Sequence, residues 1–251
     1  MKALVTGASG GLGLEFAKLL AADGHDLVLV ARSADKLERI AGELRAQFGV
    51  TVETVAQDLG VPDAAARLLE RVPSCEILIN NAGFASNARF DTIPVERTRE
   101  ELLLDVVTLT ELCRTYLPGM RERGGGRILN VASTAALLPG PFAAVYYASK
   151  AYVLSFSQAI AEESRGSGVT VTCLAPGATA TGFADRADMQ QTLLFKLPMA
   201  DAASVARAGY RAMLAGEDVE IPGLFNKLLA LLVRVTPRRL LLWISRKLIE
   251  Q

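Results

Sequence analysis

The chain has 251 residues, of which 22% are charged, and its formal net charge at pH 7 is zero. This length suits one α/β domain, and the neutral balance gives no sign of nucleic-acid binding. The only histidine is His25, and the cysteines are widely spaced, which argues against a zinc site, against any other metal centre and against a Ser-His-Asp triad. We expect the thiols of Cys75, Cys113 and Cys173 to be buried and reduced.

Short apolar runs alternate with longer amphipathic segments over most of the chain. We expect strands buried on both faces at 2–6, 26–31, 50–55, 75–80, 127–132 and 169–175. Amphipathic helices are expected at 12–23, 34–47, 62–71, 95–121 and 145–165. This alternation predicts an α/β fold, a Rossmann-type doubly wound parallel sheet with helices on both faces. In such sheets ligands bind at the carboxyl ends of the strands.

The segment 2–6 leads straight into a turn, without the pattern of a signal peptide. The longest apolar stretches are interrupted by Arg234, Arg238 and Arg239, well short of the roughly 20 residues that a membrane-crossing helix needs. We therefore expect a cytoplasmic protein.

A glycine-rich loop follows the first strand and opens the first helix. It reads Thr6-Gly-Ala-Ser-Gly-Gly-Leu-Gly13, so its spacing fits either Gly7, Gly11, Gly13 or Gly7, Gly10, Gly13. Glycines allow a tight turn close to a pyrophosphate, and the helix N-terminus offers amides to an anion. A glycine-rich loop is often only a turn, but this strand–turn–helix setting favours dinucleotide binding.

The ends of the second and third strands carry the next polar candidates. Arg32 and Ser33 stand where a site selective for NAD usually has an acidic residue. A guanidinium suits a 2′-phosphate, so we favour NADP(H) over NAD(H), although Arg32 could be an ordinary surface arginine. Asp58 and Leu59 could contact the adenine, and the alternative for Asp58 is an N-cap for the helix starting at Pro62.

Tyr146 and Lys150 lie four residues apart, with Ser133 upstream. This spacing places both side chains on one helix face. A phenol has a pKa of about 10, and an adjacent ammonium favours its ionised form. Together with a hydroxyl, the pair could move a proton to or from a substrate oxygen. Alone, the pair is more often merely a solvated one.

Six motifs in order make this chain resemble the short-chain dehydrogenase/reductase family, in its branch of about 250 residues. They are the glycine loop, Asp58, Asn80-Asn-Ala-Gly83, Asn130-Val-Ala-Ser133, Tyr146-x-x-x-Lys150 and Pro176-Gly177. The resemblance runs from Lys2 to about Thr181. It favours Gly7, Gly11 and Gly13 as the loop glycines and argues against the longer sugar-nucleotide epimerase branch.

The resemblance implies a role for each matching residue. Tyr146 would be the general acid or base, Lys150 would lower the pKa of this tyrosine and hold the nicotinamide ribose, and Ser133 would bind the substrate oxygen. The adjacent Tyr147 does not have the required spacing. The remaining contacts with the cofactor would come from Gly7, Ser9, Gly11, Leu12, Gly13, Arg32, Ser33, Asp58, Leu59, Asn81, Ala82, Gly83, Pro176, Gly177 and Thr181.

Asp105 departs from the family pattern, which usually has Asn at this point of the long fourth helix to hold a water of the proton relay. The stretch reads Leu102-Leu-Leu-Asp-Val-Val107. Asp105 is either a tolerated variant or a carboxylate that changes the pH optimum of the relay, and we count it with the catalytic candidates.

The C-terminal part is the second departure. We divide the chain into a Rossmann-fold domain at 1–223 and a basic, apolar, helical extension at 224–251, which has six basic residues and one acidic residue. Its apolar stripe, Leu240, Leu241, Ile244 and Leu248 with Trp243 beside it, covers the substrate cleft or a partner subunit, or else lies on anionic lipid.

We expect the substrate lid at about 178–200. Its apolar residues suggest an apolar or lipid-like substrate, unless they only close the core of the lid; they are Phe183, Met189, Leu193, Leu194, Phe195 and Leu197.

These features predict an NADP(H)-dependent oxidoreductase that interconverts a ketone or aldehyde and an alcohol. The alternatives are a dehydratase or epimerase on the same scaffold, or a non-catalytic NADP(H)-binding sensor or scaffold protein. Because relatives often assemble through their long fourth and fifth helices, the resemblance also implies a homodimer or homotetramer. The partners expected are therefore a small carbonyl or alcohol substrate, further copies of the chain and, in one alternative, a membrane surface.

Overall fold

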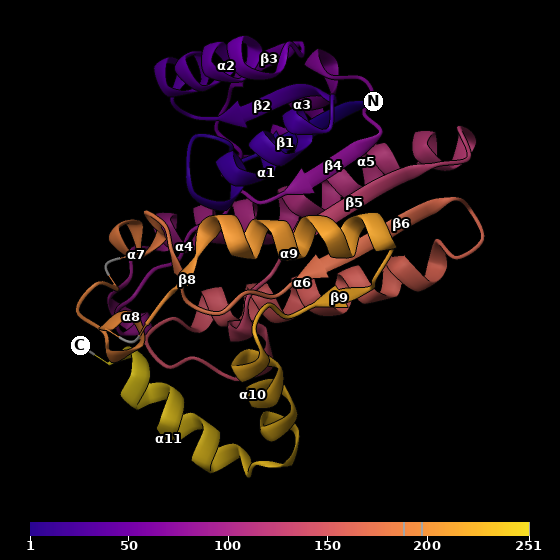
Figure 1. The fold of residues 1–251 in the computed structure, drawn as a ribbon. Coiled ribbons are helices and arrows are strands. Elements are labelled where there is room, and N and C mark those ends of the chain that lie inside the picture. Colours follow the sequence, from indigo (N-terminus) through magenta and orange to yellow (C-terminus); the bar gives the residue numbers. More distant parts are fainter. Residues whose placement is uncertain (188, 197, 251) are drawn as a thin grey trace.

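The protein is a three-layer α/β structure (Figure 1). The computed structural model describes residues 1–187, 189–196 and 198–250. Its main sheet has seven parallel strands in the order β3-β2-β1-β4-β5-β6-β9. The strands are β1 Lys2–Thr6, β2 Asp26–Ala31, β3 Val52–Ala56, β4 Ile77–Asn80, β5 Gly126–Val131, β6 Val169–Leu174 and β9 Val219–Glu220. The Rossmann-type sheet is thus confirmed.

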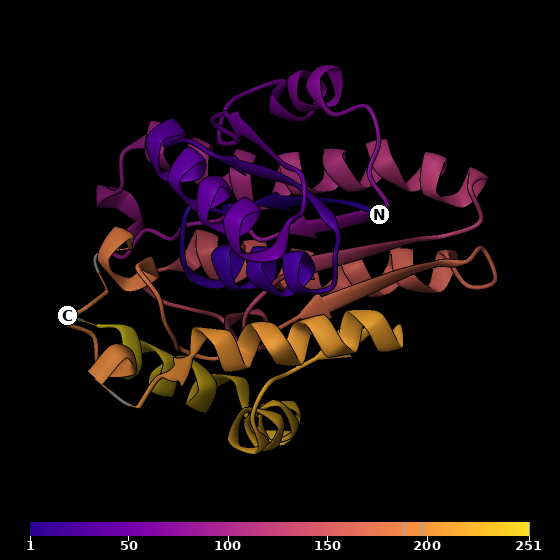
Figure 2. The same cartoon turned by 45° about the horizontal axis from the view of Figure 1, so that its top comes forward.

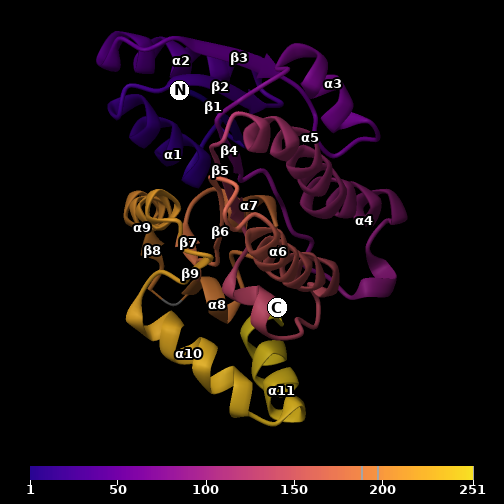
Figure 3. The same cartoon turned by 90° about the vertical axis from the view of Figure 1, so that its right-hand side faces the viewer.

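Helices cover both faces of this sheet (Figure 3). On one face α1 Gly11–Ala22, α2 Ala34–Phe48 and α9 Ala202–Ala215 pack over the strands. The other face is covered by α3 Ala64–Arg71, α4 Val95–Leu102, α5 Leu109–Glu122 and α6 Ala144–Glu163. Both faces of the sheet are therefore buried, which explains why its strands are continuous apolar runs.

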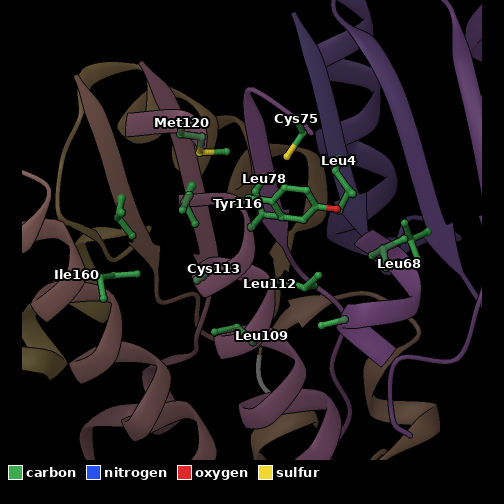
Figure 4. Close-up of a cluster of buried hydrophobic side chains, with 14 of the residues drawn as sticks. Leu4, Leu68, Cys75, Leu78, Leu109, Leu112, Cys113, Tyr116, Met120 and Ile160 are labelled. Atoms are coloured by element: carbon green, nitrogen blue, oxygen red, sulfur yellow. The ribbon is translucent and has the colours of Figure 1, made fainter. Parts of the chain in front are cut away.

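The core beneath α3, α5 and α6 contains all three cysteines, two of which are labelled in Figure 4. Cys75 and Cys113 pack there with Leu78, Leu112 and Tyr116, and the Tyr116 hydroxyl donates to the carbonyl oxygen of Val72 at 2.7 Å. All three cysteines are free and buried. Burial raises the pKa of the Cys113 thiol to about 12, which makes it a poor nucleophile.

A π-helical segment, Leu103–Thr108, joins α4 to α5. The expected helix at 95–121 is therefore correct in extent, but its hydrogen-bond pattern changes in the middle. Such segments carry one extra residue per turn and are frequent at functional sites. Here the segment contains Asp105, whose side chain is completely buried.

The region after β6 contains elements that the sequence pattern did not predict individually. They are β7 Thr179–Ala180, α7 Phe183–Arg186, α8 Leu193–Lys196 and β8 Ala200–Asp201, and β7 and β8 pair in a small parallel sheet. The long helix α9, which begins with Asp201 as its N-cap, was also not predicted.

Two further helices, α10 Leu224–Val235 and α11 Arg238–Ile249, follow β9. They form a V at the end of the molecule opposite α2 and β3 (Figures 1 and 3). Helix α11 lies beside α8 (Figure 2). No helix in the described part of the chain is both long and apolar enough to cross a membrane.

Candidate active site

A cavity of about 600 Å³ lies at the carboxyl ends of the strands and extends under the C-terminal helices. Almost every site residue predicted from the sequence lines this cavity. The predicted residues that line it are Gly7, Ser9, Gly11, Leu12, Arg32, Ser33, Asp58, Leu59, Asn81, Ala82, Gly83, Ser133, Tyr146, Lys150, Pro176, Gly177 and Thr181. Two predicted residues, Gly13 and Asp105, lie behind its wall.

The glycine loop has the geometry of a ligand cradle. Gly7 and Gly11 have φ angles of 67° and 55°, which glycine adopts without strain. A Cβ atom on Gly13 would lie 2.4 Å from the carbonyl oxygen of Gly7, so this position needs glycine for close packing. Gly10 has an extended backbone with open space around it. The structure thus supports Gly7, Gly11 and Gly13 as the constrained glycines.

The first turn of α1 opens directly into this cradle. Its N-cap, Gly10, has no side chain to accept hydrogen bonds from the first helical amides, which leaves those donors for a ligand. Asn81 secures the loop, because its side-chain amide donates to the carbonyl oxygen of Thr6 at 2.9 Å. This arrangement fits the pyrophosphate of a dinucleotide.

Basic and polar side chains follow β2 at the same end of the cavity. Arg32 is exposed, and Ser33 lies at the N-cap of α2. Lys36, one turn further, also lines the cavity, and the sequence reasoning missed it. Its position three residues after Ser33 could have revealed it. Two cations here suit an additional phosphate group.

Asp58 lies at the cavity rim after β3. Its Oδ1 atom accepts a hydrogen bond from the amide of Gly60 at 2.8 Å, which forms a local turn. The N-cap of α3 is Asp63, so the alternative that Asp58 caps this helix is wrong. The buried side chain of Leu59 completes this part of the wall.

Tyr146 and Lys150 lie one turn apart on α6, and the Lys150 Nζ atom is 5.5 Å from the centre of the Tyr146 ring. Ser133 follows β5, and its hydroxyl accepts from the amide of Ala135 at 3.1 Å. Burial and the negative charge of Asp105 raise the pKa of Tyr146 above its ordinary value, whereas the hydrogen bond with Ser133 lowers it. The phenol is therefore protonated at neutral pH.

Lys150 is held from behind by two oxygen atoms. Its Nζ atom donates to the carbonyl oxygen of Val131 at 3.2 Å and lies 3.4 Å from the Oδ2 atom of Asp105. The Oδ1 atom of Asp105 accepts from the amide of Phe84 at 3.3 Å. Asp105 thus positions the lysine without facing the cavity. Burial raises the pKa of Asp105, and the charge of Lys150 opposes this shift.

Glu101 is a second buried carboxyl group behind the site, one helical turn before Asp105, and the sequence reasoning missed it. Burial raises its pKa to about 7, and the charge of Asp105 contributes to the shift. Its position four residues before Asp105, on the same face of the predicted helix, was the available signal. Two buried acidic groups, Asp105 and Glu101, therefore lie behind the side chain of Lys150.

The opposite end of the cavity is apolar. Phe183 packs against Tyr146 with 5.3 Å between the ring centres, and Met189, Leu194 and Phe195 line the same wall. Met189 also packs in a buried cluster with Tyr146, so these residues both close the lid and face the cavity. Leu193 points elsewhere and is exposed, and Leu197 lies outside the described residues.

The C-terminal helices complete this apolar wall. Of the expected stripe, Leu241, Ile244 and Leu248 line the cavity, whereas Leu240 does not. Residues of α10 that the sequence reasoning missed also line it, namely Leu229, Leu232 and Val233. Their apolar spacing was visible, but which side faces the site depends on the packing of α10.

Comparisons with known proteins agree with this geometry. The family model described as short chain dehydrogenase matches residues 1–192. A very-long-chain 3-oxoacyl-CoA reductase of Rattus norvegicus is 36% identical over 72% of this chain. The match spans 60% of that relative's length.

Solved structures resemble the chain over nearly its whole length. A short-chain dehydrogenase from Sphingobium yanoikuyae in complex with NADPH has 34% identity and a TM-score of 0.84, covering 92% of this chain and 91% of its own. A bulky-bulky ketone specific alcohol dehydrogenase from Comamonas testosteroni has 28% identity and a TM-score of 0.79, covering 93% and 92%. This protein therefore belongs to the short-chain dehydrogenase family.

Proposed function

We propose that this protein is an NADPH-dependent reductase of an apolar, lipid-like ketone. One observation carries the proposal: a single cavity connects a phosphate-binding loop, the group Ser133, Tyr146 and Lys150, and an apolar wall. A cofactor and an apolar substrate could therefore meet at one tyrosine. Neither the site nor the comparisons favour the non-catalytic alternative, because all three side chains are present and close together.

The cofactor end of the cavity suits NADPH. The glycine loop and the first amides of α1 would hold the pyrophosphate. Arg32, Ser33 and Lys36 would hold the 2′-phosphate, and Asp58 the adenine. The ribose next to the nicotinamide would lie near Tyr146 and Lys150, and Pro176, Gly177 and Thr181 would border the nicotinamide. The similar structure that contains NADPH supports this preference. When bound, the cofactor supplies a hydride to the carbonyl carbon.

The chain's own residues would handle the oxygen of the substrate. Ser133 would donate a hydrogen bond to the carbonyl oxygen and hold it next to Tyr146. As negative charge develops on this oxygen, the neutral phenol of Tyr146 would give up its proton, leaving the alcohol. Lys150, fixed by Asp105 and Val131, would place a positive charge near the resulting phenolate. The protonated state of Tyr146 suits the direction of reduction.

The apolar end of the cavity supports the choice of substrate class. Side chains from α8, α10 and α11 form its wall, with few charged groups among them. The relative from Rattus norvegicus is a very-long-chain 3-oxoacyl-CoA reductase, and the dehydrogenase from Comamonas testosteroni is specific for bulky-bulky ketones. Both names agree with an extended or bulky apolar substrate.

The test is one assay of NADPH and NADH oxidation with 3-ketoacyl thioesters, steroid ketones, aromatic ketones and keto sugars. We expect turnover with NADPH on the first three classes and little on the sugars. Tyr146→Phe should still bind NADPH but lose at least about a thousandfold in kcat, since the proton donor is gone. Failure of every carbonyl to react, or a fully active Tyr146→Phe, would refute the proposal.

Three expectations from the sequence stay predictions: a cytoplasmic location, a homodimer or homotetramer, and the division into a domain at 1–223 and an extension at 224–251. The free, buried cysteines support the first of these.

A further inference from the structure

Helix α10 has apolar side chains on two sides. Leu229 and Val233 face the cavity. Leu224, Leu228, Leu231 and Val235 do not line it, and they are 85, 53, 60 and 79% exposed. Their spacing of four, three and four residues places them along one stripe of the helix. Large apolar side chains exposed in such a row mark an interaction surface rather than scattered surface residues.

Helix α11 also has exposed apolar side chains. Trp243 is 60% exposed and Leu240 is 46% exposed, and neither lines the cavity. We define the outer face by six exposed apolar residues, none of which lines the cavity: Leu224, Leu228, Leu231 and Val235 of α10 with Leu240 and Trp243 of α11.

Positive charge borders the outer face where α10 turns into α11. Arg234, Arg238 and Arg239 lie at this turn and form no ion pair within the described part of the chain. At the other end of α11, Glu250 pairs with Arg246 and Lys247. The turn is thus an uncompensated cationic edge next to apolar side chains.

Both ends of this helix pair are attached to the catalytic domain. In the first turn of α10, the side chain of Asn226 packs on Gly177. A Cβ atom added to Gly177 would lie 2.8 Å from the side chain of Asn226. At the end of α11, the carbonyl oxygen of Ile249 accepts from the side-chain amide of Asn87 at 3.4 Å. The outer face is therefore held in a fixed orientation relative to the cavity.

We propose that the outer face docks the protein on an anionic lipid bilayer. Leucines and a tryptophan on one side with arginines beside them are the pattern of a helix that lies in the membrane interface. Anionic headgroups would neutralise the three arginines. A second copy of the same face would instead bring two such sets of arginines together, which disfavours that occupant.

The docked orientation would also bring the cavity to the lipid. Leu232 and Ile244 line the cavity, yet they are 49 and 37% exposed, so the apolar lining reaches the surface between the two helices. A ketone dissolved in the bilayer could enter along these side chains without crossing water. This second step rests on the proposed function, whereas docking itself does not.

Trp243 is the only tryptophan of the chain, so its fluorescence reports on the outer face alone. The experiment adds the full-length protein to vesicles of phosphatidylcholine mixed with phosphatidylglycerol, and to vesicles of phosphatidylcholine only. We expect a blue shift of the emission with the anionic vesicles and a much weaker one with the neutral vesicles. Brominated lipids should quench the emission of the bound protein.

Two variants test the two components of the surface. Leu228→Glu/Leu231→Glu should abolish the blue shift, because charges replace the apolar stripe. Arg234→Gln/Arg238→Gln/Arg239→Gln should weaken vesicle binding roughly a hundredfold, since each basic residue contributes about fivefold near an anionic surface. The matched control is Leu214→Glu, an exposed leucine on α9 that should leave binding unchanged. Circular dichroism and NADPH affinity check folding.

Activity assays separate docking from the proposed function. Both variants should keep the rate on a water-soluble ketone but lose at least about tenfold on a long-chain ketone dissolved in anionic vesicles. An unchanged Trp243 emission with anionic vesicles would overturn the inference. So would the conversion of a dimer to a monomer by Leu228→Glu/Leu231→Glu without any change in vesicle binding. If no ketone reacts, whether in water or in vesicles, the proposed function is wrong. The emission of Trp243 then decides by itself whether the protein docks on the bilayer.

Discussion

The two ends of the cavity are built in different ways. The end assigned to the cofactor consists mainly of backbone: three glycines, the first amides of α1 and the loops after β2 and β4, all held by the sheet. The end assigned to the substrate consists of side chains from α8, α10 and α11, which are far apart from the glycine loop in the sequence. A backbone site tolerates few substitutions, whereas a side-chain wall can be reshaped residue by residue.

The largest effect should come from the backbone end. In Gly13→Ala, the new Cβ atom would meet the carbonyl oxygen of Gly7, so the loop must move. We expect NADPH affinity to fall at least about a hundredfold and the free energy of unfolding to fall by about 1–3 kcal/mol. Titration calorimetry and urea unfolding measure the two effects.

The control is Gly42→Ala, at an exposed helical position with open space around it. It should raise the free energy of unfolding by about 0.5–1 kcal/mol, because alanine favours the helix. Equal behaviour of the two variants would show that the loop geometry is not the constraint.

The second-largest effect should come from the basic side chains at the cofactor end of the cavity. Arg32→Asp should raise the KM for NADPH about a hundredfold, because a charge-assisted pair with the 2′-phosphate is replaced by repulsion. The KM for NADH should change little. Arg71→Asp, the same change of charge on an exposed residue of α3 outside the cavity, should alter neither value. Parallel losses for both cofactors in Arg32→Asp would contradict the assignment.

A smaller effect is expected at the side-chain end. Val233→Trp fills part of the apolar wall and should reduce kcat/KM for a long-chain ketone about tenfold while sparing a short one. Val235→Trp is the matched control, because Val235 is exposed and does not line the cavity. Assays without vesicles measure both. Equal losses on the long and the short ketone would indicate general damage instead of a shortened substrate pocket.

The smallest effect is a change of pH dependence at the junction of the two ends. The charge of Asp105 raises the pKa of Tyr146, so Asp105→Asn should lower this pKa. Because reduction needs the protonated phenol, the falling limb of its pH–rate profile should move to lower pH. Glu101→Gln should shift the limb in the same direction and less far, since Glu101 contributes less to the pKa of Tyr146. A profile that stays in place would make Asp105 a tolerated variant.

The same comparison explains how much the sequence could predict. The glycine loop, Tyr146 and Lys150 are local patterns, and their geometry follows from one strand, one turn or one helix. The strands and most helices of the first 175 residues were likewise predicted to within a few residues. Lys36 was missed because its one signal, a position three residues after Ser33 in the first turn of α2, is weak for a single surface lysine.

The geometry of the substrate end could not be predicted from local sequence patterns. Leu229 faces the cavity and Leu228 faces outward, although they are adjacent leucines. The packing of α10 on the rest of the protein, including that of Asn226 on Gly177, fixes which of them points inward. Likewise, the spacing around Asp105 predicts a regular helix, and the burial of its carboxylate against Lys150 comes from a tertiary contact.

The π-helical turn at Leu103–Thr108 has a consequence for how this family member could change. Such a turn behaves as a one-residue insertion in an α-helix. Deleting one residue there, for example Val106, would restore a regular helix, and α4 and α5 would keep their orientation because the π turn already absorbs the extra residue. Only the residues of the turn would change register, so the carboxylate of Asp105 would move relative to Lys150 while Glu101 in α4 stayed in place. A single codon deletion, with no substitution at either acid, would thus separate one buried carboxylate from Lys150 and leave the other.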